Sequence, residues 1–174
     1  MKCTDIELEL VNYFNPRSSL IIPNVAWGFN IHECDLIVVS TAGFITEVEI
    51  KISKADIKAD LKKRHKHFDT RIKRLFFAIP YYLEDCADLI PEDAGILTVG
   101  DRKGKPWDWK AVIMTRRPKN KSVYRCTLRD RYDLARLGAL RIWDLKHALK
   151  DKGKSFDRLN AKMKALGIQT EMFF

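Results

Sequence analysis

The chain has 174 residues, 46% of them hydrophobic and 32% charged, which indicates one folded globular domain and excludes an intrinsically disordered chain. Its formal net charge of +9 favours a polyanionic partner, with nucleic acid as the first candidate and an anionic membrane surface as the second. The four cysteines are far apart and form no Cys-x-x-Cys pair, so zinc-finger spacing is absent and a reducing compartment is expected. No apolar signal segment or membrane-span-length window occurs, so we expect a cytoplasmic protein without a membrane partner.

The first predicted element is a helix from about Asp5 to Phe14, because Thr4-Asp5-Ile6-Glu7 has the form of a capping box. At helical spacing, Glu7 falls inside the apolar stripe of this helix. A carboxylate on a buried face is costly unless it is paired. Two explanations stay open: Glu7 belongs to the capping box, or it reaches inward to a polar site.

Three short apolar runs follow and indicate strands. The first spans Leu20–Trp27, where Pro23 favours an edge position or a bulge. The other two lie between His32 and Lys51 and are joined by a tight turn, so they predict an antiparallel hairpin. Lys51 closes the second hairpin strand, and the two-residue period of a strand places it on the same face as Glu49.

The register of the hairpin depends on its loop. A three-residue loop over residues 41–43, with Gly43 in the left-handed conformation, places Asp35 opposite Glu49, whereas a two-residue loop places Asp35 opposite Ile50. In the first register the two carboxylates lie within about 5 Å of each other. Like charges at that distance repel unless a cation or a proton lies between them. The alternative is an exposed sheet end with solvated charges and an ordinary ion pair between the strands.

Helices and strands then alternate. Ser53 caps a lysine-rich helix that is expected to run from Lys54 to about Phe68. His65 and His67 are two residues apart, which on a helix turns them away from each other, so they do not form a metal pair. A short helix is expected from Tyr81 to Leu89, and three apolar runs predict further strands: Arg74–Pro80, Ala94–Gly100 and Trp109–Thr115.

The C-terminal part is predicted to be helical, over Leu128–Leu149 and, after a break at Gly153, over about Ser155–Leu166. We expect a core over residues 1–127 and a helical extension over residues 128–174, packed on the same domain. The order of elements predicts an α/β (α+β) fold, in which a mixed sheet with a central antiparallel hairpin is flanked by helices. The lysine-rich helix should lay the strand that follows it parallel to the second hairpin strand.

Cys34-Asp35 on one strand, Glu49-Ile50-Lys51 on the next and Glu7 on the preceding helix resemble the PD-(D/E)xK nuclease superfamily. The usual Pro-Asp pair of that superfamily is replaced by Cys34-Asp35. The stretches 47–56, 75–80 and 91–96 are similar to the MmcB-like family of proposed DNA-repair nucleases, and the similarity covers roughly residues 5–100. The resemblance implies a restriction-endonuclease-like fold.

The resemblance also implies a site and a reaction. Asp35 and Glu49 would be ligands of Mg²⁺ or Mn²⁺, Glu7 would be the helix-borne acid that some members add, and Lys51 would position or activate the attacking water. The implied function is a metal-dependent endonuclease that hydrolyses DNA phosphodiester bonds, in DNA repair or phage DNA metabolism. A catalytically inactive nucleic-acid-binding protein on the same fold is the alternative, and RNA stays open as a substrate.

DNA, double-stranded or branched, is the expected partner, and cleavage of both strands would suit a homodimer. Phosphate contacts are expected from basic residues of the lysine-rich helix, of the stretch that follows it and of the loop after the last strand. These residues are Lys54, Lys58, Lys62, Arg71, Lys73, Arg116, Arg117, Lys119 and Lys121.

Overall fold

The computed structural model describes residues 1–60, 67, 69–100 and 111–165. The chain divides into two compact units, Met1–Leu137 and Gly138–Phe174. The division falls within the long C-terminal helix rather than at its beginning near residue 128, because Leu134 and Leu137 are buried in the core of the first unit. No helix in the described part of the chain has the length and hydropathy needed to cross a membrane.

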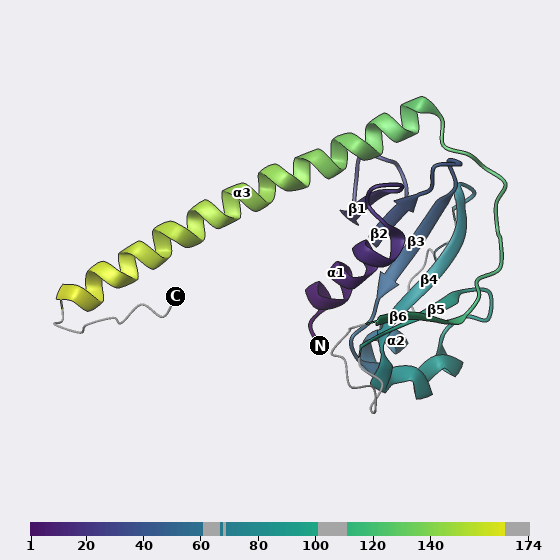
Figure 1. Cartoon of the computed structure of the whole chain (residues 1–174), viewed down its shortest axis with the longest axis horizontal. Coiled ribbons are helices and arrows are strands. Elements are labelled where there is room, and N and C mark those ends of the chain that lie inside the picture. Colours follow the sequence, from purple (N-terminus) through teal and green to yellow (C-terminus); the bar gives the residue numbers. More distant parts are fainter. Residues whose placement is uncertain (61–66, 68, 101–110, 166–174) are drawn as a thin grey trace. The chain divides into compact units, whose positions relative to one another are not determined.

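A six-stranded mixed sheet forms the first unit (Figure 1). Neighbours pair antiparallel from β1 to β3, parallel from β3 to β5, and antiparallel again at β6. This architecture confirms the predicted mixed sheet with a central hairpin, and it also confirms the parallel pairing of β3 with β4. In order across the sheet, the strands are β1 (Leu20–Val25), β2 (Cys34–Val39), β3 (Ile45–Ile50), β4 (Ile72–Pro80), β5 (Gly95–Gly100) and β6 (Ala111–Arg116).

The two faces of the sheet have separate cores, because strand side chains alternate between faces. The helix α1 (Cys3–Phe14) packs Ile6 and Leu10 against Leu36 and Val48 on one face (Figure 1). On the other face, α2 (Lys54–Asp60) and the 3₁₀ helix η1 (Tyr81–Leu89) contribute to a cluster around Phe77. The buried ionisable side chains of Glu47, Glu49 and Lys51 lie on this second face, away from α1.

The hairpin has the three-residue loop. Gly43 has a φ of 85°, in the left-handed region that favours glycine, and its N–H donates to the Ser40 carbonyl at 2.8 Å. The ladder pairs Val39 with Ile45 and Leu36 with Val48. Continuing this register by one pair places Asp35 opposite Glu49, so the first of the two predicted registers is confirmed.

Three helix predictions need correction. The capping box of α1 forms at Asp5, whose Oδ2 accepts from the Lys2 N–H at 2.8 Å, so Glu7 is not the capping residue. The helix predicted to reach residue 68 does not include His67, which lies in a turn with a φ of 53°; residues 61–66 and 68 are outside the described part. The helix α3 (Leu128–Ala165) continues through Gly153, because one glycine costs only about 1 kcal/mol within a long helix.

Candidate functional site

Three ionisable side chains lie on one face of the sheet, two from β3 and one from the residue that follows it. Glu47, Glu49 and Lys51 alternate with Val48 and Ile50, and their exposed fractions are 0%, 1% and 5%. Burying charged groups costs several kcal/mol each unless partners compensate them. The surrounding side chains supply those partners.

The ammonium of Lys51 lies among three carboxylates. Its Nζ is 2.7 Å from Glu49 Oε2, 2.8 Å from Asp60 Oδ1 and 3.9 Å from Asp35 Oδ2. Burial alone would lower the pKa of Lys51, but the charges and hydrogen bonds of Glu49 and Asp60 outweigh it and raise that pKa above its ordinary value. Lys51 is therefore a cation at neutral pH, held between two of the predicted metal ligands, Asp35 and Glu49.

Asp35 is the accessible acid of this group. Its side chain is 39% exposed, and its Oδ2 accepts a hydrogen bond from the Ile50 N–H at 2.7 Å. This bond to the neighbouring strand fixes the carboxylate at the end of the hairpin. Asp35 and Lys51 thus connect the buried groups of β3 to the surface.

Glu7 approaches Asp35 from α1. It is partly buried, and burial together with the negative charge of Asp35 raises the pKa of its carboxyl group. Burial and the charges of Asp35 and Glu7 also raise the pKa of Cys3, in the first turn of the same helix. With the capping role excluded, Glu7 keeps the other role considered from sequence, that of an acid near a polar site.

A set of buried residues that sequence reasoning missed lies next to Glu49. His32 Nε2 and His67 Nδ1 lie 2.8 Å and 2.7 Å from the same oxygen, Glu47 Oε1. The other ring nitrogen of His67, Nε2, lies 2.6 Å from Asp60 Oδ2. Glu47 could have been found from the two-residue period that it shares with Glu49. His67 could not, because the predicted helix turned it in a different direction from the turn in which it lies.

These contacts set the charges of the missed residues. Burial would raise the pKa of Glu47, but hydrogen bonds to His32 and His67 lower it below its ordinary value. Burial would lower the pKa of His67, but Asp60 and Glu47 raise it to about 9. At neutral pH a protonated His67 therefore joins the carboxylates of Glu47 and Asp60.

Two groups of three residues within the described part bring metal-ligand atoms within 4.8 Å of one another: His32–Glu47–His67 and Glu49–Asp60–His67. The predicted set Glu7, Asp35 and Glu49 is not such a group. Of that set, Asp35 and Glu49 flank Lys51 on adjacent strands, whereas Glu7 comes from the helix on the opposite face of the sheet.

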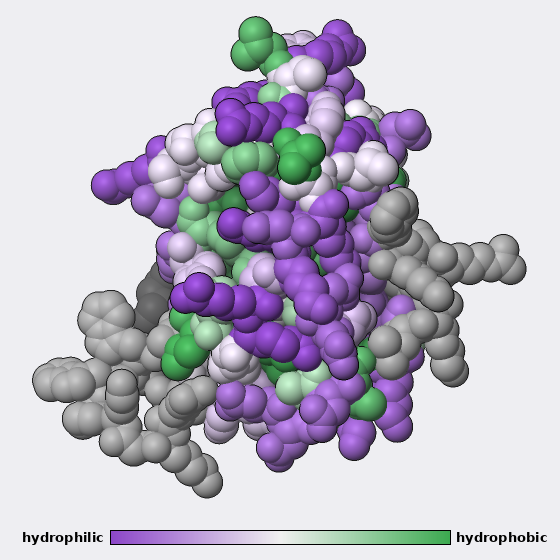
Figure 2. Space-filling model, turned by 90° about the vertical axis from the view of Figure 1, so that its right-hand side faces the viewer, coloured by the Kyte–Doolittle hydropathy of each residue, from purple (hydrophilic) through white to green (hydrophobic). Residues whose placement is uncertain are grey.

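The residues predicted to contact phosphates differ in their exposure and in the partners that they already have. Lys54 and Lys58 on α2 and Arg117 and Lys119 after β6 are exposed, while Lys62 is outside the described residues. Hydrophilic side chains cover most of the face shown in Figure 2, and hydrophobic residues form only small separate groups there. This composition is compatible with a polar partner.

Two further lysines of the predicted contacts already have partners. Lys73 Nζ lies 3.2 Å from the centre of the Phe44 ring. Lys121 Nζ lies 2.6 Å from Asp93 Oδ2. Both ammonium groups are therefore attached to neighbouring elements, and a phosphate would have to compete with these contacts.

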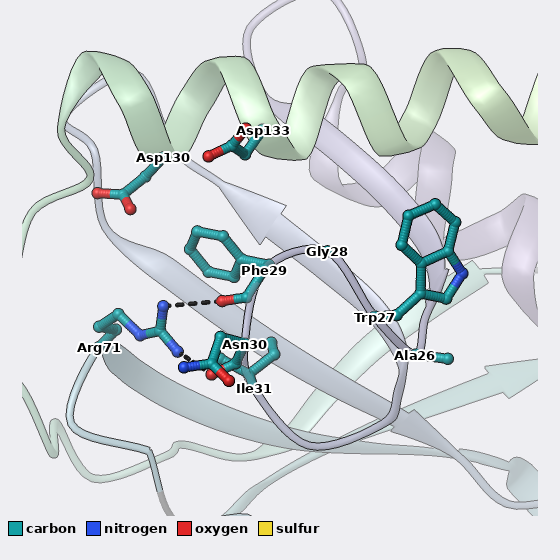
Figure 3. A pocket seen from close by; sticks show the side chains of 9 residues that line it. All are labelled: Ala26, Trp27, Gly28, Phe29, Asn30, Ile31, Arg71, Asp130 and Asp133. Carbon is teal, nitrogen blue, oxygen red and sulfur yellow. Dashed lines mark hydrogen bonds between the residues drawn. The ribbon is translucent and has the colours of Figure 1, made fainter.

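The two predicted arginine contacts hold loops in place. Arg71 donates to Asp69 and to the carbonyl oxygens of Phe29 and Asn30, the latter two at 2.9 and 2.7 Å (Figure 3). Arg116 donates to the Ala94, Ile90 and Pro91 carbonyl oxygens at 2.9, 3.1 and 2.7 Å. A phosphate bound by either arginine would have to share donors that already satisfy backbone carbonyls.

A cavity of about 580 Å³ lies where Arg71 holds its loop (Figure 3). Residues 26–31, Arg71, Asp130 and Asp133 line it, and the Arg71 guanidinium stacks 4.5 Å from the centre of the Phe29 ring. None of the four predicted catalytic residues lines this cavity. It is a separate feature of the first unit.

The order of α1, β1–β3, α2 and β4, with acids on β2 and β3 and a lysine after β3, is the arrangement of the restriction-endonuclease-like superfamily. The sequence model of the family described as DNA repair protein MmcB-like matches residues 20–149, so this chain belongs to the MmcB-like family, which lies in that superfamily. The family resemblance noted in the sequence is confirmed, although the match begins after α1 and extends to residue 149 rather than covering residues 5–100. Membership indicates a DNA-related function.

A solved structure supports the fold. The SPO1766 protein of unknown function from Silicibacter pomeroyi is 18% identical to this chain, with a TM-score of 0.59 over 88% of this chain and 94% of that one. At this identity the likeness concerns the fold alone. A comparison with curated proteins gives no match.

Proposed function

We propose that this protein is a metal-dependent nuclease that hydrolyses DNA phosphodiester bonds. The observation that carries the proposal is the meeting of Asp35 and Glu49 on adjacent strands with the Lys51 ammonium between them. A protein that only binds DNA has no need for two facing carboxylates and a buried lysine. Membership of a DNA repair family supports DNA as the substrate.

The chemistry of the predicted donors suits a hard divalent cation. Asp35 and Glu49 offer carboxylate oxygens, which Mg²⁺ and Mn²⁺ prefer, and Glu7 offers a further one from α1. The position between Asp35 and Glu49 already attracts a cation, since Lys51 Nζ lies 2.7 Å from one and 3.9 Å from the other. When bound, Mg²⁺ would hold a phosphate oxygen and acidify a water molecule.

Lys51 supplies a fixed positive charge. Its raised pKa keeps it protonated at neutral pH, so it acts by orienting water or stabilising the negative charge that develops on the phosphate, not by removing a proton. Because Glu49 and Asp60 hold the ammonium, it needs little reorganisation during the reaction. A substrate phosphate would reach this charge from the side of Asp35, because the Asp35 side chain is partly exposed and lies 3.9 Å from the ammonium.

The substrate backbone would lie near exposed cations. Lys54 and Lys58 lie on α2, the helix that begins three residues after Lys51, and Arg117 and Lys119 lie in the loop after β6. Phosphate contacts of this kind provide affinity independent of sequence and weaken as salt rises. Double charge reversal of Lys54 and Lys58 should therefore weaken DNA binding and reduce its salt dependence.

Cleavage assays test the proposal. Purified protein is incubated with supercoiled, nicked, branched and single-stranded DNA, and with RNA, in Mg²⁺, Mn²⁺ or EDTA. Asp35→Asn is the best inactivating variant, because Asp35 is partly exposed and its loss should spare the fold. Asp144→Asn, at an exposed position of the second unit, is the matched control. Equal cleavage by all three proteins would refute the site assignment.

The second candidate is a DNA-binding protein without catalysis. Two observations favour it: Lys51 pairs closely with Glu49 and Asp60, and the three predicted ligands do not form a compact group in the described part of the chain. Salt-sensitive binding of DNA with no cleavage under any metal condition would establish this alternative. Glu7→Gln tests whether the acid on α1 takes part in cleavage. A fully active variant would show that Glu7 does not belong to the site.

A further inference from the structure

Three ligand-type atoms converge beside β3, away from Asp35. His32 Nε2 and His67 Nδ1 both face Glu47 Oε1, at 2.8 and 2.7 Å, and the ligand atoms of these three residues lie within 4.8 Å of one another. They come from the segment before β2, from β3 and from the turn before β4. Three separate segments of the first unit are thus brought together at one carboxylate.

One oxygen of this carboxylate is not used. Glu47 is fully buried, and its Oε2 has no hydrogen-bond partner among the described residues. An unsatisfied buried carboxylate oxygen is costly, and native structures contain few such atoms. An ion bound to Glu47 would give this oxygen a partner.

His67 also has the supporting partner expected of a metal ligand. Its Nε2 lies 2.6 Å from Asp60 Oδ2, on the side of the ring opposite Nδ1. In metal sites, histidine ligands usually donate their second ring N–H to a carboxylate, which fixes the orientation of the ring and the nitrogen that binds the ion. Here Asp60 would hold the N–H of Nε2 and leave Nδ1 directed toward Glu47.

We infer that His32, Glu47 and His67 form a second metal site, which binds a first-row transition ion such as Zn²⁺. Two imidazole nitrogens and one carboxylate favour such ions over Mg²⁺, which prefers oxygen ligands. Three protein ligands leave a coordination position open, as in catalytic zinc sites. With ligand bonds of about 2.0–2.2 Å, the present N–O separations would have to widen by about 0.5 Å.

This site does not rest on the nuclease proposal. Its ligands differ from Asp35, Glu49 and Glu7, and they favour a different class of ion. Glu49 Oε1 is nevertheless 3.8 Å from His67 Nδ1, so the two sites are neighbours and each needs its own variants.

Zinc binding by the untagged, metal-stripped full-length chain tests the site. Titration calorimetry and elemental analysis should give one tightly bound Zn²⁺ per chain. His32→Gln and His67→Gln should each weaken Zn²⁺ binding at least about 100-fold. Asp60→Asn, which removes the carboxylate that supports His67 and also pairs with Lys51, should weaken it about 10–100-fold. His147→Gln, at an exposed position of the second unit, should bind Zn²⁺ as the wild type does.

A second readout covers the case in which a histidine variant does not fold. In the wild-type protein, Zn²⁺ should shift the ring ¹⁵N resonances of His32 and His67 and leave those of His147 unchanged. Absence of Zn²⁺ binding by the wild type, wild-type affinity in either histidine variant, or an unshifted resonance of His32 or His67 would each overturn the inference. A protein that binds Zn²⁺ here but cleaves no nucleic acid would keep this site and lose the nuclease proposal.

Discussion

Replacing Lys51 with methionine should strongly destabilise the fold, because it removes a buried cation. Its ammonium lies within 2.8 Å of Glu49 and Asp60, whose side chains are 1% and 3% exposed. Methionine fills a similar volume but leaves these carboxylates without their cation. Breaking a buried ion pair on one side costs about 3–5 kcal/mol. For a chain of this size, that corresponds to a fall in melting temperature of about 6–20 °C.

Urea and thermal unfolding followed by circular dichroism, in EDTA to exclude metal compensation, would measure this loss. Lys150→Met is the matched control: Lys150 is exposed in the second unit, and its replacement should change stability by less than about 0.5 kcal/mol. Adding Glu49→Gln to Lys51→Met should recover part of the loss, since it removes one of the uncompensated charges. A loss below about 1 kcal/mol for Lys51→Met would refute the buried network as described.

Three further predictions concern other parts of the first unit. Hydrogen bonds from Arg71 lower the pKa of Asp69 below 3.8, so this pair stabilises the fold above pH 3.8 and stops doing so as pH falls through the folded-state pKa; the stability difference between wild type and Asp69→Asn should shrink over that range in acid titrations. Gly43→Ala should cost about 1–2 kcal/mol in urea unfolding, because alanine is strained at a φ of 85°; unchanged stability would count against the loop described here. Burial raises the pKa of Cys126 to about 11, so its alkylation at pH 8 should be much slower in native than in unfolded protein, as mass spectrometry of the modified peptide would show.

The sheet and the hairpin register were predictable from local sequence. Short apolar runs predict the strands, and one glycine, Gly43, decides the loop length and thereby places Asp35 opposite Glu49. The prediction succeeded because the loop conformation depends on few residues. The parallel pairing of β3 with β4 followed from the helix between them.

The buried histidines were not predictable in this way. His67 and His32 are 20 and 15 residues from Glu47, and the positive φ of His67 contradicts the helix that the surrounding lysine-rich sequence favours. Their convergence is a tertiary contact without a local pattern. The same limit applies to Arg71 and Arg116, whose charges suggested phosphate contacts although the structure uses them to bind backbone carbonyls.

The loss of stability expected on replacing Lys51 could also be predicted only from the structure. Lysine side chains are mostly exposed in proteins, so nothing in the sequence indicates that Lys51→Ala would also destabilise the fold. The structure shows its side chain 6% exposed between carboxylates, so that substitution would confuse a folding defect with a catalytic one. Asp35 is the better probe of chemistry.

The role proposed for Asp35 and Glu49 is to hold a metal ion that serves DNA hydrolysis. Its most direct test is the cleavage rate of DNA in Mg²⁺ or Mn²⁺ for wild type and Asp35→Asn, with stability measured on the same samples. The account predicts metal-dependent cleavage that falls at least about 100-fold in Asp35→Asn, while the free energy of unfolding changes by less than about 1 kcal/mol. Cleavage by Asp35→Asn at the wild-type rate would contradict it.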